Sequence, residues 1–187
     1  MEMDKEARKE TIKELLKKGD HICSERLNGL FYHHGIYVGH GRVIHLSGPI
    51  RGTGKFRSSS SFVSTPRWPC SQKACQGIFC GGIVITCVDC FLDGHSLYVI
   101  DYECSKVSSF LEKHDISVKS PDEVVDLAYA EFYRKINSDG YHLLNRNCEH
   151  FATYCKTGES FSMQSLWLKA EGLASRLFFL LLGTIRG

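Results

Sequence analysis

Residues 31–47, FYHHGIYVGHGRVIHLS, constrain the fold of this chain more than any other stretch. Two runs rich in β-branched and aromatic residues flank a Gly-His-Gly segment, and this pattern predicts an antiparallel β-hairpin. If Gly39 to Gly41 form a three-residue loop, Val38 lies opposite Arg42 and the register of the hairpin is fixed. The hairpin therefore predicts an antiparallel sheet as the centre of the fold.

The same register places two histidines on one face of the hairpin. His45 lies opposite Gly35 and diagonal to His33, and diagonal neighbours in a sheet are about 7–8 Å apart at the backbone. The absence of a side chain at Gly35 leaves room beside His33. A two-residue loop would put the two histidines on opposite faces. Strand alternation sends His34, the rival candidate for a catalytic base, to the other face.

Residues 144–155, LNRNCEHFATYC, predict a helix that begins at a cysteine. Asn147 is a good N-cap, so Cys148 becomes the first helical residue. Backbone N–H groups at a helix start favour negative charge, which predicts a lowered thiol pKa and a place for an oxyanion. Cys148 is thus a candidate nucleophile, with His33 as its base and His45 as the partner that orients the base. A metal ligand and a buried core thiol are the alternative interpretations.

Capping residues, turn pairs and hydrophobic periods predict the remaining elements. These signals indicate, in chain order, a polar helix over 4–18 ended by Gly19, a strand over 19–24, a second hairpin over 81–104 turning at Asp93-Gly94, a helix starting with a capping box at 120–123, and Gly158 as the end of the Cys148 helix. Together they predict an α+β fold in a single domain over 1–187, an antiparallel sheet packed against helices, with a core of roughly residues 18–158.

Five of the nine cysteines lie between positions 70 and 90, at Cys70, Cys75, Cys80, Cys87 and Cys90. A structural zinc site usually takes two close pairs, and CVDC supplies one. The predicted strand would also send Cys87 and Cys90 to opposite faces, because they are three residues apart. With no helix expected after the pair, a redox role has little support. We therefore expect no metal and no cofactor, and a zinc-stabilised domain is an alternative hypothesis.

Charge and composition narrow the possible partners and the compartment. The net charge of +2 does not favour nucleic acid, and the basic stretch 51–67 lacks the interleaved aromatics that stack on bases. The charged first ten residues contain no apolar core of a secretory signal, and nine cysteines suit a reducing compartment, so we expect a cytoplasmic protein. The apolar run Leu177 to Leu182 is too short to span a bilayer, but it suits docking on the domain or at a membrane surface. The sequence does not indicate an oligomeric state.

Three of these segments resemble, in the same order, motifs of one enzyme family. GDHI, HHGIYVGHGRVIHL and NCEHF resemble the lead-in, the histidine hairpin and the cysteine motif of the lecithin:retinol acyltransferase-like (LRAT) family. The resemblance covers roughly residues 18–158. GIVITCVDCFLDGHSLYVIDY and FATYCKTG are most similar to the plant members, which are called NC-domain proteins. The resemblance implies a circularly permuted, NlpC-like form of the papain fold.

The resemblance also implies a reaction. The nucleophile of the family maps to Cys148, its general base to His33 and its second histidine to His45. The family takes an acyl group from a glycerophospholipid as a thioester and passes it to water, an amine or an alcohol. It uses no metal or organic cofactor, and its relatives often act at membranes. The expected activity is a thiol acyltransferase or phospholipase A-type hydrolase with a phospholipid or membrane partner.

This chain departs from the animal relatives at three places. They commonly have Trp-Ala where this chain has His34-Gly35, and several have a longer C-terminal anchor than the tail over 159–187. The segment 48–80, rich in Gly, Ser and basic residues, does not map onto them. A loop of that length is functional or disordered. A non-enzymatic module that binds a membrane or protein partner through this insert and the tail is therefore a further alternative.

Overall fold

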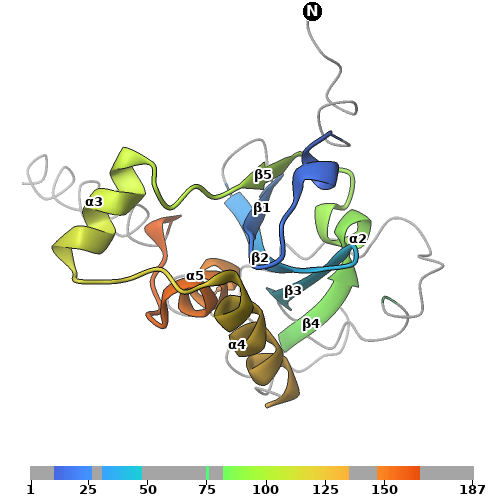
Figure 1. Cartoon of the computed structure of the whole chain (residues 1–187). Helices are drawn as coiled ribbons and strands as arrows, with labels where there is room; N and C mark the ends of the chain where they lie inside the picture. Colours follow the sequence, from blue (N-terminus) through green and yellow to red (C-terminus); the bar gives the residue numbers. More distant parts are fainter. Residues whose placement is uncertain (1–10, 27–30, 48–74, 76–81, 135–146, 165–187) are drawn as a thin grey trace, which may run out of the picture.

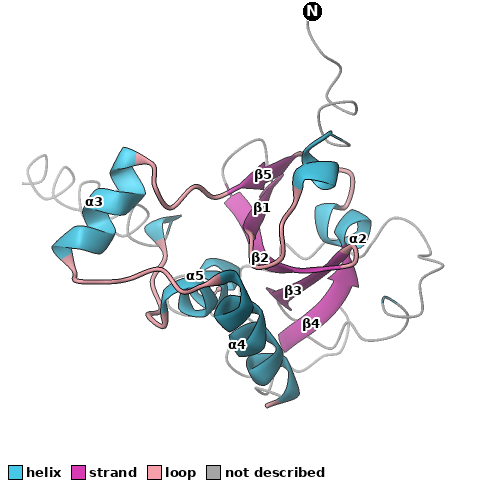
Figure 2. Ribbon diagram, viewed as in Figure 1, coloured by secondary structure: helices cyan, strands magenta, loops and turns pink. Residues whose placement is uncertain are grey.

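The computed structural model of the chain describes residues 11–26, 31–47, 75, 82–134 and 147–164. Its elements are, in chain order, β1 (His21–Arg26), β2 (Phe31–Gly39), β3 (Arg42–Ser47), β4 (Gly82–Cys87), α2 (Val88–Leu92), β5 (Leu97–Val99), α3 (Ser105–Lys113), α4 (Pro121–Tyr133) and α5 (Cys148–Thr157). The five strands form one antiparallel sheet in the order β4-β3-β2-β1-β5 (Figures 1 and 2). The predicted α+β class with an antiparallel sheet is confirmed.

The sheet buries a different set of side chains on each face. On one face, α4 and α5 pack against alternate residues of the central hairpin, including Ile36 and Ile44. On the other face, α2 contributes Phe91 and Leu92, which pack with Val43. Helix α3 stands away from the sheet (Figure 1). Among the described residues, no helix combines the length and the apolar character needed to cross a membrane.

The turn of the central hairpin differs from the prediction. Gly39 pairs with Arg42, so the loop contains two residues, His40 and Gly41, rather than three. Their φ angles are +52° and +69°. Two residues of positive φ are what a tight hairpin turn with right-handed strand twist requires, and a histidine there is tolerated beside glycine neighbours.

A β-bulge restores the predicted register. The pairing shifts by one residue between Tyr37 and Gly39, and Tyr37 then pairs with Val43 as the three-residue loop would have arranged. The extra residue in β2 compensates for the shorter loop. His33 and His45 therefore share a face of the sheet.

The pairing between β2 and β3 is limited to the turn end of the hairpin. Within residues 31–47, the paired positions run from Gly39↔Arg42 only as far as Ile36↔Ile44. The first part of β2 pairs on its other edge with β1, ending at Phe31↔Arg26. One edge of β2 is thus open to other partners along residues 31–35, and the candidate site is built there.

The predicted second hairpin is wrong. Strand β4 ends at Cys87, whose side chain caps α2 by accepting a hydrogen bond from the backbone of Cys90. The chain then turns at Asp93, and β5 pairs with β1 at the opposite edge of the sheet. The physical reason is the core: the helical turn buries both Phe91 and Leu92 in one cluster on a single face of the sheet, whereas successive residues of a strand point to opposite faces.

The local helix signals were reliable. Ser120 and Glu123 form the predicted capping box of α4, Asn147 caps α5, and Gly158 ends α5 with a φ of +88°. Helix α3 was not predicted. Helical structure before β1 ends at residue 15 rather than 18, and residues 4–10 lie outside the described part of the chain.

Two further predictions concern segments outside the described residues. These are the insert over 48–80, apart from Cys75, and the tail beyond residue 164. The proposed roles of both in membrane or partner binding therefore stay predictions.

We predict that Gly35→Ala destabilises the protein by overpacking the sheet beneath α2. A Cβ at this position would lie 2.7 Å from Val43 Cγ1 and 3.0 Å from Phe91 Cε2. Overpacking of this kind costs about 1–3 kcal/mol. Urea unfolding should give a smaller cost of Gly35→Ala in a Val43→Ala background, because the nearest clash is gone. Equal costs in both backgrounds would show that the close approach is not the cause.

Candidate functional site

The two histidines selected from the sequence form a hydrogen-bonded pair. His33 Nε2 lies 2.9 Å from His45 Nδ1, and the rings meet edge to face with centroids 4.8 Å apart. His45 Nε2 lies 3.1 Å from Thr86 Oγ1 on the neighbouring strand β4. Strands β2, β3 and β4 thus each contribute one member to a short polar chain.

Only one assignment of protons in this chain makes His33 a base. If His45 Nε2–H donates to Thr86, His45 Nδ1 carries the lone pair and accepts from His33 Nε2–H. His33 Nδ1 is then unprotonated and available to accept a proton. No described residue forms a recorded hydrogen bond with that atom. In this assignment, Thr86 and His45 hold His33 in the tautomer that a general base needs.

The histidine pair packs against an aromatic side chain, with His45 buried and His33 half-buried. Phe91 packs on both rings, with centroid distances of 5.1 Å to His33 and 5.3 Å to His45. Burial lowers the pKa of His45 to about 3, with the nearby positive charge of Arg26 adding to the effect. Burial, then the neighbouring His45 and the charge of Arg26, lower the pKa of His33 well below its ordinary value. Both imidazoles are therefore neutral at physiological pH.

Cys148 is the first residue of α5, as predicted. The Asn147 side chain accepts hydrogen bonds from the backbone N–H groups of Glu149 and His150, which fixes the start of the helix. Cys148 is completely buried, and its thiol donates to the carbonyl oxygen of Tyr32 at 3.7 Å. The nucleophile candidate thus lies against the open edge of β2.

The predicted lowering of the Cys148 pKa is wrong for the protein as folded. Burial raises the pKa of this thiol to about 12. The backbone N–H groups of His34, Glu149 and Cys148 itself act in the opposite direction, as expected at a helix start, and the charge of Glu149 adds to the rise. Desolvation outweighs the helix terminus, so the resting thiol is neutral.

The structure joins His33 and His45 by a hydrogen bond and places Cys148 against the open edge of β2. His33 packs with Phe91 on the α2 face, whereas Cys148 packs with Ile36 on the α4/α5 face. No hydrogen bond between Cys148 and His33 or His45 is recorded among the described residues. The sulfur meets β2 at Tyr32 and His34, the two residues that flank His33.

His34, the rival base, shares the face of Cys148 but is engaged at both ring nitrogens. Its Nε2 accepts from the Gln164 amide at 2.9 Å, so its Nδ1–H donates to His21 Nε2 at 2.8 Å. His21 Nδ1 in turn lies 2.9 Å from the Tyr102 hydroxyl. His34 therefore has no lone pair to offer Cys148, and its role is to join β1, β2 and the C-terminal segment.

Sequence reasoning missed the carboxylate beside the nucleophile. Glu149 is buried and accepts hydrogen bonds from the Ser162 hydroxyl at 2.5 Å and the Met163 backbone at 3.0 Å. Gln164, which this anchoring positions, accepts from the Tyr32 backbone N–H at 2.8 Å. Glu149 thus ties residues 162–164 to the start of α5 and to the open edge of β2. The signal available in the sequence was a glutamate directly after the cysteine, at the start of a helix expected to pack against the sheet. A carboxylate buried there must accept hydrogen bonds, which would have indicated nearby donors.

We predict that the protein loses stability as the pH falls below about 6.5. Burial lowers the pKa of four histidines below the ordinary value of 6.5, at positions His21, His33, His34 and His45. The unfolded chain takes up protons there and the folded chain does not, so stability present above that pH is lost below it. Each histidine contributes a slope of up to about 1.4 kcal/mol per pH unit.

Urea unfolding between about pH 7.5 and 5.5 measures this slope. His34→Gln should make it shallower, while His40→Asn, at the exposed turn, is the matched control and should leave it unchanged. A slope that is the same in wild type and His34→Gln would contradict the assignment of His34 as a buried neutral group.

Comparison with known proteins agrees with this geometry. The family model described as lecithin retinol acyltransferase matches residues 14–161. The chain is 36% identical to LEAD-SENSITIVE 1 of Arabidopsis thaliana over 154 residues, which is 76% of this chain and 58% of that protein. It is 27% identical to Egg-laying defective protein 26 of Caenorhabditis elegans over 150 residues, 79% of this chain and 41% of that protein.

The chain spans about half the length of these curated relatives. The family match includes all five strands, among them the two of the histidine hairpin, and the cysteine helix. One of the two relatives is a plant protein, in agreement with the resemblance to plant NC-domain proteins. The α+β fold and the extent of the match together show that the chain belongs to the lecithin retinol acyltransferase family.

Proposed function

We propose that the protein is a cysteine-dependent acyltransferase or phospholipase A-type hydrolase that acts on glycerophospholipids. The observation that supports the proposal is the His33–His45–Thr86 chain, in which one proton assignment leaves Nδ1 of a neutral His33 free to act as a base. His33 belongs to the strand whose open edge Cys148 contacts at the Tyr32 carbonyl. Membership of the lecithin retinol acyltransferase family supports acyl transfer as the reaction class.

The pKa values of the two groups decide how the reaction starts. Burial raises the pKa of Cys148 to about 12 and lowers that of His33, so both shifts oppose a preformed ion pair. The proton therefore leaves the sulfur as the sulfur attacks the ester carbonyl, in a single general-base step. The substrate must open the site enough for Cys148 Sγ and His33 Nδ1 to come within hydrogen-bond distance.

The first half-reaction forms a thioester. As the Cys148 sulfur bonds to the carbonyl carbon, its proton passes to His33 Nδ1, and negative charge develops on the carbonyl oxygen. The Cys148 backbone N–H contributes to stabilising that oxyanion. When the tetrahedral intermediate collapses, the bond to the glycerol oxygen breaks and His33 returns the proton to it. The products are an acyl-Cys148 thioester and a lysophospholipid.

The second half-reaction releases the acyl group. His33 takes a proton from water, an amine or an alcohol as that acceptor attacks the thioester carbonyl. The carbon–sulfur bond then breaks, and the proton held by His33 goes to the Cys148 sulfur. The product is a fatty acid, an amide or an ester, according to the acceptor. No step calls for a metal ion or redox cofactor.

The partner that follows from this proposal is a phospholipid at a membrane surface. The full activities of the longer relatives are not assigned to this chain, because it covers only part of their length. A second function is favoured by one observation, the complete burial of Cys148. A closed site suits a non-enzymatic module that binds a membrane or protein partner with the same fold.

We predict that a short-chain phosphatidylcholine acylates wild-type protein at Cys148. Intact-mass spectrometry should detect one hydroxylamine-labile acyl adduct, and Cys148→Ala should remove it, because the proposed mechanism forms the thioester on the Cys148 sulfur. Cys155→Ala, which removes a buried thiol from the same helix, is the matched control and should keep the adduct. Folded wild-type protein that forms no adduct and releases no fatty acid with several lipid donors would favour the interaction module.

We also predict a graded loss of rate along the polar chain. His33→Asn should lower the acylation rate by about 10²–10⁴-fold, as expected for loss of a general base. Thr86→Val keeps the side-chain shape and removes one hydrogen bond, so the loss should be about 2–10-fold. His45→Asn should fall between them. Single-turnover release of lysophospholipid measures all three, and a Thr86→Val rate below that of His33→Asn would contradict the assigned roles.

A further inference from the structure

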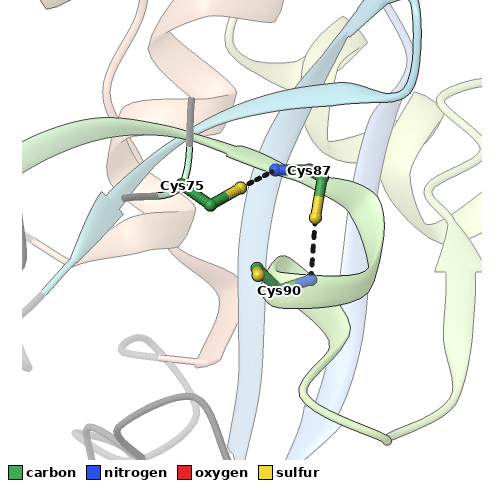
Figure 3. Close-up of side chains that lie close together, drawn as sticks. All are labelled: Cys75, Cys87 and Cys90. Carbon is green, nitrogen blue, oxygen red and sulfur yellow. Dashed lines mark hydrogen bonds between the residues drawn. The ribbon is translucent and has the colours of Figure 1, made fainter. Parts of the chain in front are cut away.

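Three cysteines meet where β4 passes into α2. The Sγ atoms of Cys75, Cys87 and Cys90 all lie within 4.8 Å of one another. Figure 3 shows the three side chains lying close together at this junction. Cys87 is the last residue of β4 and pairs with Arg42, so the sheet fixes its position. Cys90 lies in the first turn of α2, and Cys75 comes from the segment before β4. The junction of β4 and α2 and the preceding Cys75 thus present three thiols to one point.

The spacing of the sulfurs fits one metal ion. Zinc–sulfur bonds are about 2.3 Å long, so sulfurs in a tetrahedral zinc site lie about 3.8 Å apart. An ion would need to draw the Sγ atoms together by no more than about 1 Å from the 4.8 Å limit, within the range of small side-chain rotations. Thiolate is the ligand that zinc and other soft divalent metals prefer.

The surroundings of the sulfurs also suit bound thiolates. The backbone N–H of Cys87 donates to Cys75 Sγ at 3.0 Å, and that of Cys90 donates to Cys87 Sγ at 3.4 Å. Hydrogen bonds to sulfur stabilise the negative charge that a metal-bound thiolate carries and orient it toward the ion. Cys75 and Cys87 are buried while Cys90 is partly exposed, so solvent reaches the cluster at Cys90.

We propose that Cys75, Cys87 and Cys90 form a zinc-binding site that fastens Cys75 to the junction of β4 and α2. This proposal narrows the zinc-stabilised hypothesis drawn from the sequence to three ligands. The sequence predicted one strand that would send Cys87 and Cys90 to opposite faces, but the chain changes from strand to helix between them, and both sulfurs face the same point. The ion displaces one proton from each thiol on binding. The fourth position is filled by water or by an exchangeable ligand.

A metal ion at this site would also help to position the side chain that packs against the histidine pair. Cys90 is followed directly by Phe91, whose ring packs on His33 and His45. An ion that holds Cys90 therefore holds this aromatic side chain of the candidate active site. Loss of the ion should loosen α2 first, because this helix contains only five residues and is fixed at its start by Cys87.

A redox pair formed by Cys87 and Cys90 is the rival interpretation. A disulfide between two cysteines would not require Cys75. The sulfur of Cys75 nevertheless belongs to the same cluster and accepts a hydrogen bond from the backbone N–H of Cys87. The convergence of three thiols therefore favours a metal over a disulfide couple. The dependence on Cys75 is what separates the two in an experiment.

The test uses the full chain, purified under reducing conditions without chelator. Elemental analysis should give about one zinc ion per wild-type chain. Cys75→Ser, Cys87→Ser and Cys90→Ser should each lose most of it. Cys104→Ser, which removes an exposed thiol outside the cluster, is the matched control and should keep it. His33→Asn should also keep the ion, which distinguishes this site from metal bound at the histidine pair.

A second measurement on wild-type protein guards against variants that fail to fold. Zinc should protect Cys75, Cys87 and Cys90 from iodoacetamide, and chelation should expose them, as read by peptide mass spectrometry. Cobalt added to the stripped protein should give thiolate-to-metal charge-transfer absorption. Folded protein without zinc and without that absorption would overturn the proposal. So would zinc lost in His33→Asn, or an air-formed Cys87–Cys90 disulfide with metal content unaffected by Cys75→Ser.

Discussion

The open edge of β2 is the constraint on which the rest of the structure depends. Beyond Ile36↔Ile44, β3 no longer pairs with β2, and the backbone groups of the strand need other partners. The Tyr32 N–H donates to Gln164 and the Tyr32 carbonyl accepts from the Cys148 thiol. These hydrogen bonds at the open edge bring together the start of α5, residues 162–164 and the first part of β2. Glu149 then holds the arrangement by accepting hydrogen bonds from the segment that carries Gln164.

Burial gives the site its electrostatic character. The thiol of Cys148 and the imidazoles of His33 and His45 all have pKa values shifted toward their neutral forms. The charged residue near the sulfur, Glu149, is engaged in hydrogen bonds and disfavours the thiolate further. A neutral thiol and a neutral base form a stable, unreactive resting state. Activation then depends on a substrate that opens the site and delivers a carbonyl, which links reactivity to lipid binding.

Local signals in the sequence predicted the parts of the fold that local forces determine. The caps at Ser120 and Asn147 were readable because a cap bonds residues two or three positions away. The shared face of His33 and His45 was also readable, although a bulge rather than a longer turn produces it. The position of β5 could not be predicted, because its partner β1 is remote in sequence. Whether the chain after β4 forms a hairpin or a helical turn depends on the burial of Phe91 and Leu92. The links of Glu149 and Gln164 to β2 were missed for the same reason. The net rise in the Cys148 pKa was also missed, because it is caused by burial, which exists only once the core is assembled.

The protonation state of Cys148 at rest tests the account most directly. Infrared difference spectra between wild type and Cys148→Ser isolate the S–H stretching band of this one thiol and do not depend on solvent access to it. The account predicts that the band is present at neutral pH in the free protein and disappears only when a lipid ester acylates the sulfur. Absence of the band at neutral pH, with thiolate absorption in its place, would mean that an ion pair with a histidine exists before substrate arrives and would contradict the proposed start of the reaction.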